Sequence, residues 1–99
     1  MARPEYFYVY MLASAPYGTL YIGVTSDLLK RVWEHKSKVV PGFTTRYGVD
    51  RLVWYEVHDA AETAMRREKQ MKEWKREWKF NLIGGENSHW ADLYSTLLG

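Results

Sequence analysis

Residues 6–24 read YFYVYMLASAPYGTLYIGV, two β-forming segments on either side of a turn sequence that contains one proline and one glycine. In the first segment the side chains alternate, so Tyr6, Tyr8 and Tyr10 share one face and the apolar residues between them share the other. Proline presets one backbone angle of a turn and glycine tolerates positive φ. The stretch therefore predicts an antiparallel β-hairpin.

The remaining elements are assigned outward from this hairpin. They are, in order, a helix over 28–36 with Asp27 as a candidate N-cap, a loop over 39–48, a strand over 51–57, a long helix from about residue 60 to about residue 83 with a break near Trp74, and a short helix over 89–97 capped by Ser88. Gly84 and Gly85 are expected to end the long helix.

These elements predict one fold class. The order is β-β-α-β-α-α, with the short terminal helix in addition, and it indicates an α/β protein of the α+β type. The expected architecture is a small three-stranded, mainly antiparallel sheet flanked by helices. The direction of the third strand stays open at this point, because a helix precedes it. A chain of 99 residues has room for a single domain, residues 1–99.

Composition excludes some classes of site. The chain has no cysteine, which excludes disulfides and thiolate metal sites. It shows no apolar run of about 20 residues and no signal peptide, so we expect a cytoplasmic protein without a membrane partner. Residues 66–79 hold seven basic and three acidic residues. This excess suits a nucleic-acid partner, but a solvated helix with internal ion pairs explains it equally well.

Glu68 is unusual for its position. It falls within an apolar helical stripe made up of Ala61, Ala64, Met65, Met71, Trp74 and Trp78. A carboxylate on a buried face is costly unless it is paired or binds a metal ion. Either a functional site or a structural ion pair with Arg31 or Lys72 would satisfy it.

Two further groups of residues are weak signals taken singly. Tyr8, Tyr10 and Tyr21 would share one face of the hairpin, although tyrosines are also simply good strand formers. Arg31 and His35 lie one turn apart on the same helix, where such residues are often ordinary surface.

Together these residues form a pattern that resembles the GIY-YIG nuclease family, and in particular its short, stand-alone bacterial members. The pattern comprises Tyr8-Val9-Tyr10, Tyr21-Ile22-Gly23, Arg31, His35, the 63–68 run that ends on Glu68, and the segment 82–90. The likeness extends from about residue 6 to residue 93. One departure is that the glycine of the first motif is Tyr8 here.

The resemblance implies a role for each matching residue. Glu68 would hold one Mg²⁺ or Mn²⁺ ion, with water and substrate phosphate completing its shell. Arg31 would neutralise charge on the phosphoryl oxygens, and Tyr10 and Tyr21 would position or deprotonate the attacking water. His35 would accept the tyrosine proton or only hydrogen-bond it, and Asn87 would support the site. The side chains implied to contact nucleic-acid phosphates are those of Lys30, Lys36, Arg46, Arg67 and Lys72.

Two classes of function follow from this pattern. The first is a metal-dependent endonuclease that hydrolyses phosphodiester bonds in DNA, structure-selective or of low specificity. The second is a non-catalytic nucleic-acid-binding module that keeps the nuclease fold, and a structural domain without a ligand is a third option. We expect a monomer or a weak dimer. The apolar residues Trp90, Leu93, Tyr94, Leu97 and Leu98 would form either a dimer edge or a helix packed on its own core.

Overall fold

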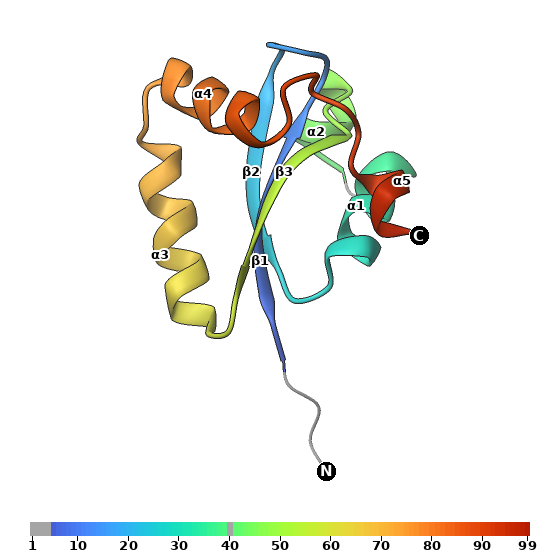
Figure 1. Ribbon diagram of the computed structural model, residues 1–99. Helices are drawn as coiled ribbons and strands as arrows, with labels where there is room; N and C mark the ends of the chain where they lie inside the picture. Colours follow the sequence, from blue (N-terminus) through green and yellow to red (C-terminus); the bar gives the residue numbers. More distant parts are fainter. Residues whose placement is uncertain (1–4, 40) are drawn as a thin grey trace.

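The computed structural model describes residues 5–39 and 41–99. Its elements are β1 (Phe7–Ala13), β2 (Leu20–Thr25), α1 (Leu28–Lys36), α2 (Phe43–Tyr47), β3 (Arg51–His58), α3 (Ala61–Lys72), α4 (Arg76–Glu86) and α5 (Tyr94–Leu97). The sheet stands between α3 and α4 on one side and α1 and α5 on the other (Figure 1). The molecule therefore has three layers.

The sheet has the strand order β2-β1-β3, and both neighbouring pairs are antiparallel. This confirms the predicted fold class and gives β3 the direction that the sequence left open. Tyr10 lies on the central strand, opposite Gly23 of β2 and Tyr55 of β3. Strand β1 is thus flanked by a strand on each side, whereas β2 lies at an edge of the sheet.

The two faces of the sheet carry separate apolar clusters, as the alternation in the first segment predicts. Val9 and Met11 pack with Ala64, Met71 and other residues of the α3–α4 side. Tyr10 and Leu12 pack on the opposite face with Leu28 and Val32 of α1. Every second residue of β1 therefore faces α1, which is why Tyr10 can meet side chains of that helix.

The 39–48 segment is not the continuous loop that was expected, because its residues 43–47 form α2. Glycines bound this helix on both sides. Gly42 has φ of 120° and Gly48 has φ of 65°, and the amide of Gly48 donates to the carbonyl of Thr44. A left-handed glycine at this position ends a helix efficiently. Five residues are too few to produce a helical period in the sequence, which explains the error.

Two predicted helix limits are also wrong. Gly84 and Gly85 lie within α4 and do not end it. Helix α5 begins at Tyr94 instead of His89, because the Asn87 side chain forms hydrogen bonds to both the amide and the carbonyl of Ala91 and so turns the chain there. Trp90, in between, has φ of 54°, which is incompatible with a helix. The predicted break near Trp74 is confirmed, since α3 ends at Lys72 and α4 begins at Arg76.

The apolar stripe proposed for the long helix is shorter than predicted. Ala64 and Met71 are buried, but Met65 is 61% exposed and Trp78 is 50% exposed. The break after Lys72 changes the direction of the chain, so Trp78 no longer continues the face that Ala64 begins. Glu68 lies between Ala64 and Met71 in sequence and is only partly exposed.

The C-terminal segment packs on the domain itself. Trp90 is buried in the cluster on the α3–α4 side, and Leu93, Tyr94 and Leu97 pack against the cluster beneath α1. An ion pair between Lys36 and Asp92 ties this segment to α1. Leu98 alone of the five apolar residues is exposed. Within the described residues, no helix combines the length and the hydropathy needed to span a membrane.

Candidate functional site

The centre of the candidate site is the place where Tyr10 crosses Gly23. The two residues are direct partners in the β1–β2 ladder. A Cβ built on Gly23 would lie 2.5 Å from the hydroxyl oxygen of Tyr10 and 2.6 Å from its Cζ atom. Only glycine leaves room for the Tyr10 ring to pass over β2, and the ring is almost completely buried there.

A short chain of hydrogen bonds begins at the Tyr10 hydroxyl. It lies 3.2 Å from Nε2 of His35, and Nδ1 of His35 lies 2.8 Å from Oγ1 of Thr44. His35 is only 2% exposed, and Thr44 is also buried. Sequence reasoning placed Tyr10 and His35 in one site but missed Thr44, because that residue was assigned to a loop. Its neighbours in the sequence carry no signal that would have identified it.

Tyr21 completes a cluster of three rings. Its ring centroid lies 6.3 Å from that of Tyr10 and 5.4 Å from that of His35. In the ladder Tyr21 stands opposite Leu12, two residues from the Tyr10–Gly23 pair, so the two tyrosines share a face as diagonal neighbours. Tyr21 is partly exposed and therefore less buried than Tyr10.

Tyr10 is held as a neutral phenol. Its pKa is raised to about 12, mainly by burial and also by the proximity of Tyr21 and Glu68, and this is the net value after a hydrogen bond and the positive charge of Arg31 have acted in the opposite direction. Burial removes water from around the phenolate and destabilises it, and this effect is larger than the stabilisation that Arg31 provides. With the protein residues alone, Tyr10 is therefore not ionised near neutral pH.

Arg31 approaches Tyr10 from α1. Burial lowers its pKa, but hydrogen bonds to Tyr10 and Glu34 outweigh that and keep the guanidinium charged. Its Nη1 atom lies 3.2 Å from a carboxylate oxygen of Glu34, three residues along the same helix. Sequence reasoning did not single out Glu34. The i, i+3 spacing from Arg31 was the available signal.

His35 is held neutral by the same surroundings. Burial lowers its pKa, and so does the positive charge of Arg31, while Glu34 has a smaller opposite effect. A neutral imidazole has one nitrogen that accepts and one that donates. His35 can therefore accept a hydrogen bond from Tyr10 while donating one to Thr44.

Glu68 lies on α3, which covers the side of the sheet opposite α1. Its charge is near enough to raise the pKa of Tyr10, and α3 packs against β1 and β2. Its ion-pair partner is Lys72 at 3.6 Å, one turn further along α3 and more exposed. The predicted pair with Lys72 is thus present, without removing Glu68 from the neighbourhood of Tyr10.

The donors at this position suit a single hard cation. Within the described part of the chain, no three His, Cys, Asp or Glu side chains gather to form a complete cage. Mg²⁺ commonly binds one or two carboxylates and keeps several waters. A partly buried carboxylate that is paired with a more exposed lysine fits that requirement.

The remaining predicted residues lie apart from this cluster. Asn87 donates to the carbonyl of Val53 in β3 and exchanges hydrogen bonds with Ala91, so its contacts hold the C-terminal turn to the sheet. Lys36 pairs with Asp92, and Arg67 pairs with Glu56 of β3. Lys30 and Arg46 are exposed on α1 and α2.

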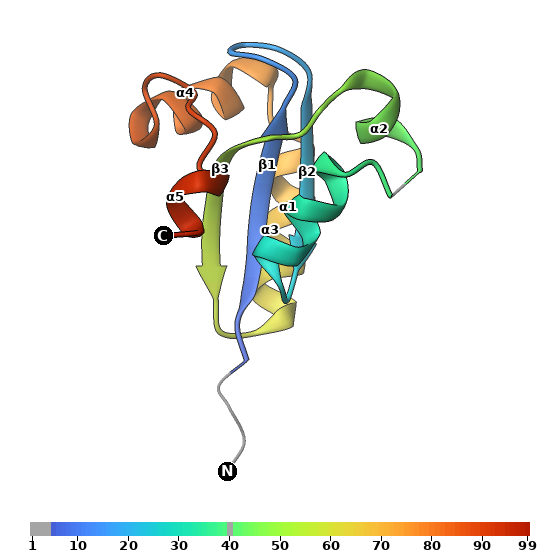
Figure 2. The ribbon, with the colours of Figure 1, turned by 90° about the vertical axis from the view of Figure 1, so that its right-hand side faces the viewer.

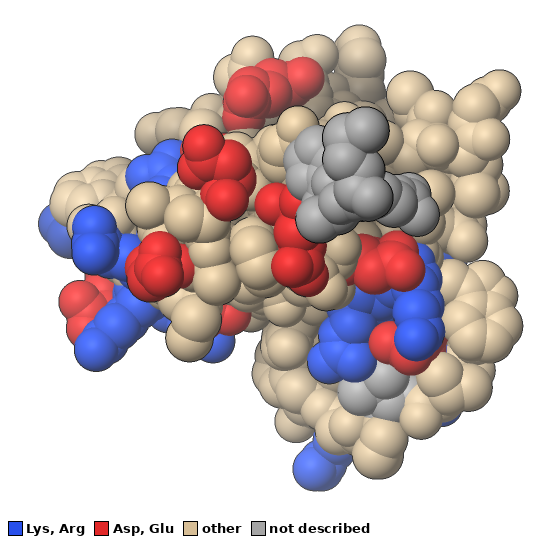
Figure 3. Space-filling view, turned by 90° about the horizontal axis from the view of Figure 1, so that it is seen from below, with Lys and Arg blue, Asp and Glu red and all other residues tan. Residues whose placement is uncertain are grey.

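On the side of the molecule seen from below, charge alone does not mark a binding face. In the view from below, acidic side chains are interspersed with Lys and Arg side chains and no continuous basic surface is seen (Figure 3). Any phosphate contacts on this side would therefore be made by individual residues.

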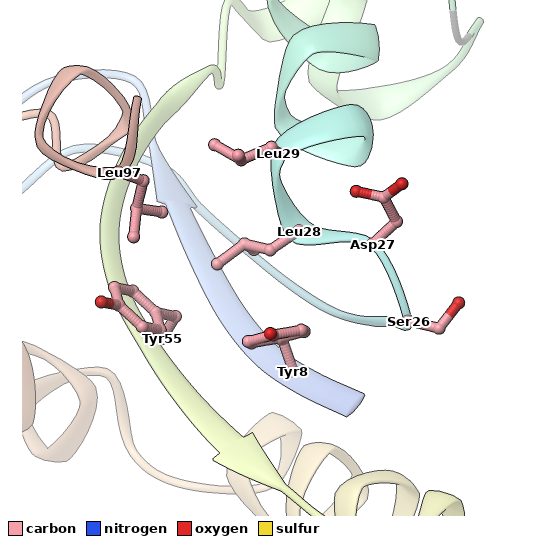
Figure 4. Close-up of a pocket in the computed structure, with 7 residues that line it drawn as sticks. All are labelled: Tyr8, Ser26, Asp27, Leu28, Leu29, Tyr55 and Leu97. Carbon is pink, nitrogen blue, oxygen red and sulfur yellow. The ribbon is translucent and has the colours of Figure 1, made fainter. Parts of the chain in front are cut away.

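Tyr8, which replaces the first glycine of the family motif, packs against the cluster that contains Tyr10, on the same face of the sheet. It lines a hollow of about 210 Å³ together with Tyr55, Leu28, Leu97 and the start of α1 (Figure 4). The substitution therefore changes the packing beneath α1 and leaves the Tyr10–His35–Thr44 chain intact.

Replacing Gly23 by alanine is expected to displace the Tyr10 ring and to lower the free energy of unfolding by about 1–3 kcal/mol, the usual cost of overpacking a core. Urea denaturation measures this. Gly85→Ala is the matched control, because a Cβ there would meet nothing within 4 Å and the change should stabilise α4 by about 1 kcal/mol. Equal effects of the two substitutions would contradict the close approach at Gly23.

Known proteins are similar to this chain in sequence and in fold. The GIY-YIG catalytic domain matches residues 6–81. A UPF0213 protein of Haloquadratum walsbyi is 33% identical over 78 residues, which cover 79% of this chain and 86% of that protein. A UPF0213 protein of Natronomonas pharaonis is 35% identical over 79 residues, which cover 80% and 92%. The solution NMR structure of the UPF0213 protein BH0048 from Bacillus halodurans superposes with a TM-score of 0.51 and 32% identity, covering 82% of this chain and 85% of that one.

Proposed function

We propose that this chain, which belongs to the GIY-YIG nuclease family, is a metal-dependent endonuclease that hydrolyses phosphodiester bonds in DNA. The family implies a nucleic-acid substrate and, in general, a divalent metal ion. The observation that carries the proposal is the convergence on one buried phenol: Tyr10 is hydrogen-bonded to His35, and both Arg31 and Glu68 are near enough to shift its pKa.

The first chemical task is to activate water. Because the pKa of Tyr10 is about 12, its hydroxyl is protonated near neutral pH and is a poor general base by itself. We therefore assign Tyr10 to a proton relay. The water gives a proton to the Tyr10 oxygen while the Tyr10 hydroxyl gives its own proton to Nε2 of His35, which donates through Nδ1–H to Thr44. The resulting hydroxide attacks phosphorus, and the bond to the leaving oxygen breaks.

The second task is to stabilise the charge that develops on the phosphate. Arg31, which stays charged beside Tyr10, is assigned to the non-bridging oxygens. Glu68 would hold Mg²⁺ or Mn²⁺, and the ion would supply Lewis-acid stabilisation to the phosphate and the leaving oxygen. Tyr21, beside Tyr10 and partly exposed, is assigned to positioning the water.

The phosphate contacts beyond the reacting group are assigned to the remaining basic residues. Lys30 and Arg46 are exposed and available for this role. Lys36, Arg67 and Lys72 would have to exchange their carboxylate partners for phosphates. We assign Asn87 a supporting role, through the turn it holds against β3.

A panel of labelled DNAs tests the proposal: duplex, flap, fork and single strand, each incubated with Mg²⁺, with Mn²⁺ and with EDTA. Metal-dependent cutting of any of them supports the endonuclease. Binding without cutting on every substrate and with both metals would overturn it in favour of the non-catalytic module.

The relay makes the rate depend on pH. Because the folded-state pKa of His35 lies below its ordinary value, the imidazole stays neutral above pH about 6.5 and accepts a proton there. We expect the cleavage rate to fall as the pH drops below that range, and folding stability to fall with it, because the unfolded state then binds more protons than the folded one. A pH–rate profile together with urea denaturation at each pH measures both. A rate that stays flat through the pH range in which the His35 ring takes up its proton would contradict the relay.

Thr44 is a positioning residue in this scheme, because it acts through His35. Thr44→Val removes the hydroxyl that pairs with Nδ1, and we expect cleavage to fall about tenfold, the worth of one buried hydrogen bond. The ¹⁵N chemical shifts of the His35 ring should show a changed tautomer balance, which a purely structural defect would not produce. Thr44→Ser should restore both. Normal tautomer signals in an impaired Thr44→Val protein would contradict the assignment.

A further inference from the structure

Helix α2 exposes two large rings. Phe43 is 46% exposed and Tyr47 is 52% exposed, although both are residues that a small domain normally buries. They lie one helical turn apart with ring centroids 4.9 Å from each other and planes tilted by 49°. Each ring supports the other and leaves surface open to solvent. Figure 2 shows α2 projecting beyond β2 at the side of the sheet.

The segment that carries these rings is basic in sequence. Between Glu34 and Asp50 the sequence has no acidic residue, and it carries Lys36, Lys38 and Arg46. The guanidinium carbon of Arg46 lies 5.5 Å from the ring centroid of Tyr47. A hollow of about 600 Å³ adjoins them, lined by Pro41, Gly42, Phe43, Thr45, Arg46 and Tyr47. Apolar rings next to an exposed arginine suit a ligand that is both flat and anionic.

The inner side of the same helix belongs to the candidate site. Thr44, next to Phe43, is hydrogen-bonded to His35, which is hydrogen-bonded to Tyr10. Two glycines with positive φ hold the ends of α2 in place. A nucleic-acid strand bound on the outer face of α2 would therefore be held at a fixed position relative to the Tyr10 hydroxyl.

We propose that Phe43 and Tyr47 bind an unpaired nucleotide of the DNA substrate by stacking on its base, with Arg46 contacting an adjacent phosphate. Every base has a π-face, so such a platform accepts any sequence. A paired base in a duplex is already stacked between its neighbours and cannot use it. The inference rests on the proposed function and narrows its substrate to DNA with single-stranded character.

Binding in EDTA tests the platform without any cleavage. The affinity of a short labelled oligo(dT) is measured by fluorescence anisotropy for the wild type and for Phe43→Ala/Tyr47→Ala. Stacking on an aromatic ring contributes enough that the double variant should bind about tenfold or more weakly. Trp78→Ala is the matched control, because its ring is equally exposed but lies on α4, across the sheet. The control should bind like the wild type.

Two further measurements keep the test decisive if the double variant is poorly folded. In wild-type protein, the NMR signals of the Phe43 and Tyr47 rings should shift when oligo(dT) is added, and an oligonucleotide of abasic sites should shift them less. A blunt-ended duplex should bind equally well to wild type and double variant. Ring signals that do not shift would overturn the inference, and so would an equal loss of affinity for duplex and for single strand in the double variant. Concentration-dependent dimerisation through α2 that oligo(dT) leaves unaffected would also overturn it.

The failure of this inference is distinguishable from the failure of the proposed function. If the rings bind oligo(dT) but none of the DNAs in the panel is cut, the stacking inference is supported and the endonuclease proposal is contradicted. If DNAs of the panel are cut but the double variant binds oligo(dT) like the wild type, the endonuclease proposal is supported and the stacking inference is contradicted.

Discussion

Replacing Glu68 by alanine is expected to reduce DNA cleavage in Mg²⁺ by about 10³-fold or more, because a Lewis-acid metal supplies several kcal/mol of transition-state stabilisation and Glu68 is the acidic side chain whose charge reaches Tyr10. The fold should be retained, since the partner that is lost is an exposed lysine on the same helix. Single-turnover cleavage and urea denaturation measure the two effects.

Glu73→Ala is the control for this substitution. Glu73 is exposed at the end of the same helix, so it matches Glu68 in charge and element but not in position. The Glu73→Ala protein should cleave DNA like the wild type. A direct measurement of Mn²⁺ binding should show weaker binding for Glu68→Ala and no change for Glu73→Ala. A Glu68→Ala protein that binds Mn²⁺ and cuts normally would remove Glu68 from the site.

Replacing Tyr10 by phenylalanine is expected to lower the cleavage rate by about 10²–10⁴-fold, the range that a positioned proton-transfer group contributes. The ring still fills the space over Gly23, so packing is preserved. The loss of the hydroxyl leaves Nε2 of His35 without its partner, which should cost about 1 kcal/mol of folding stability. The rate and the stability are measured as for Glu68.

Tyr21→Phe separates the two tyrosines. Tyr21 contacts Tyr10 and His35 through its ring, and that contact survives the loss of its hydroxyl. Its expected effect is therefore smaller than that of Tyr10→Phe. If Tyr21→Phe were inactive and Tyr10→Phe nearly normal, the water-activating role would belong to Tyr21, and the relay through His35 would be wrong.

The local features of the fold were predictable because their causes are local. Alternation with a period of two assigned the strands and divided β1 between two faces, and Asp27 accepts from the amide of Lys30 as an N-cap should. The family motif brought Tyr10, Tyr21, Arg31, His35 and Glu68 together as one set. The errors fell where local signals are weakest, in the five-residue helix α2 and in the turn that follows α4.

The sequence by itself therefore determined the fold class, the family and the candidate site residues other than Thr44 and Glu34, because periodicity, caps and motif spacing are written along the chain. Only the tertiary structure decided what surrounds each group. The β1–β2 register places Tyr10 over Gly23, the packing of α1 and α2 joins His35 to Thr44, and burial moves the pKa values of Tyr10 and His35 in opposite directions. Those properties depend on atoms distant in sequence, and the fold alone brings them together.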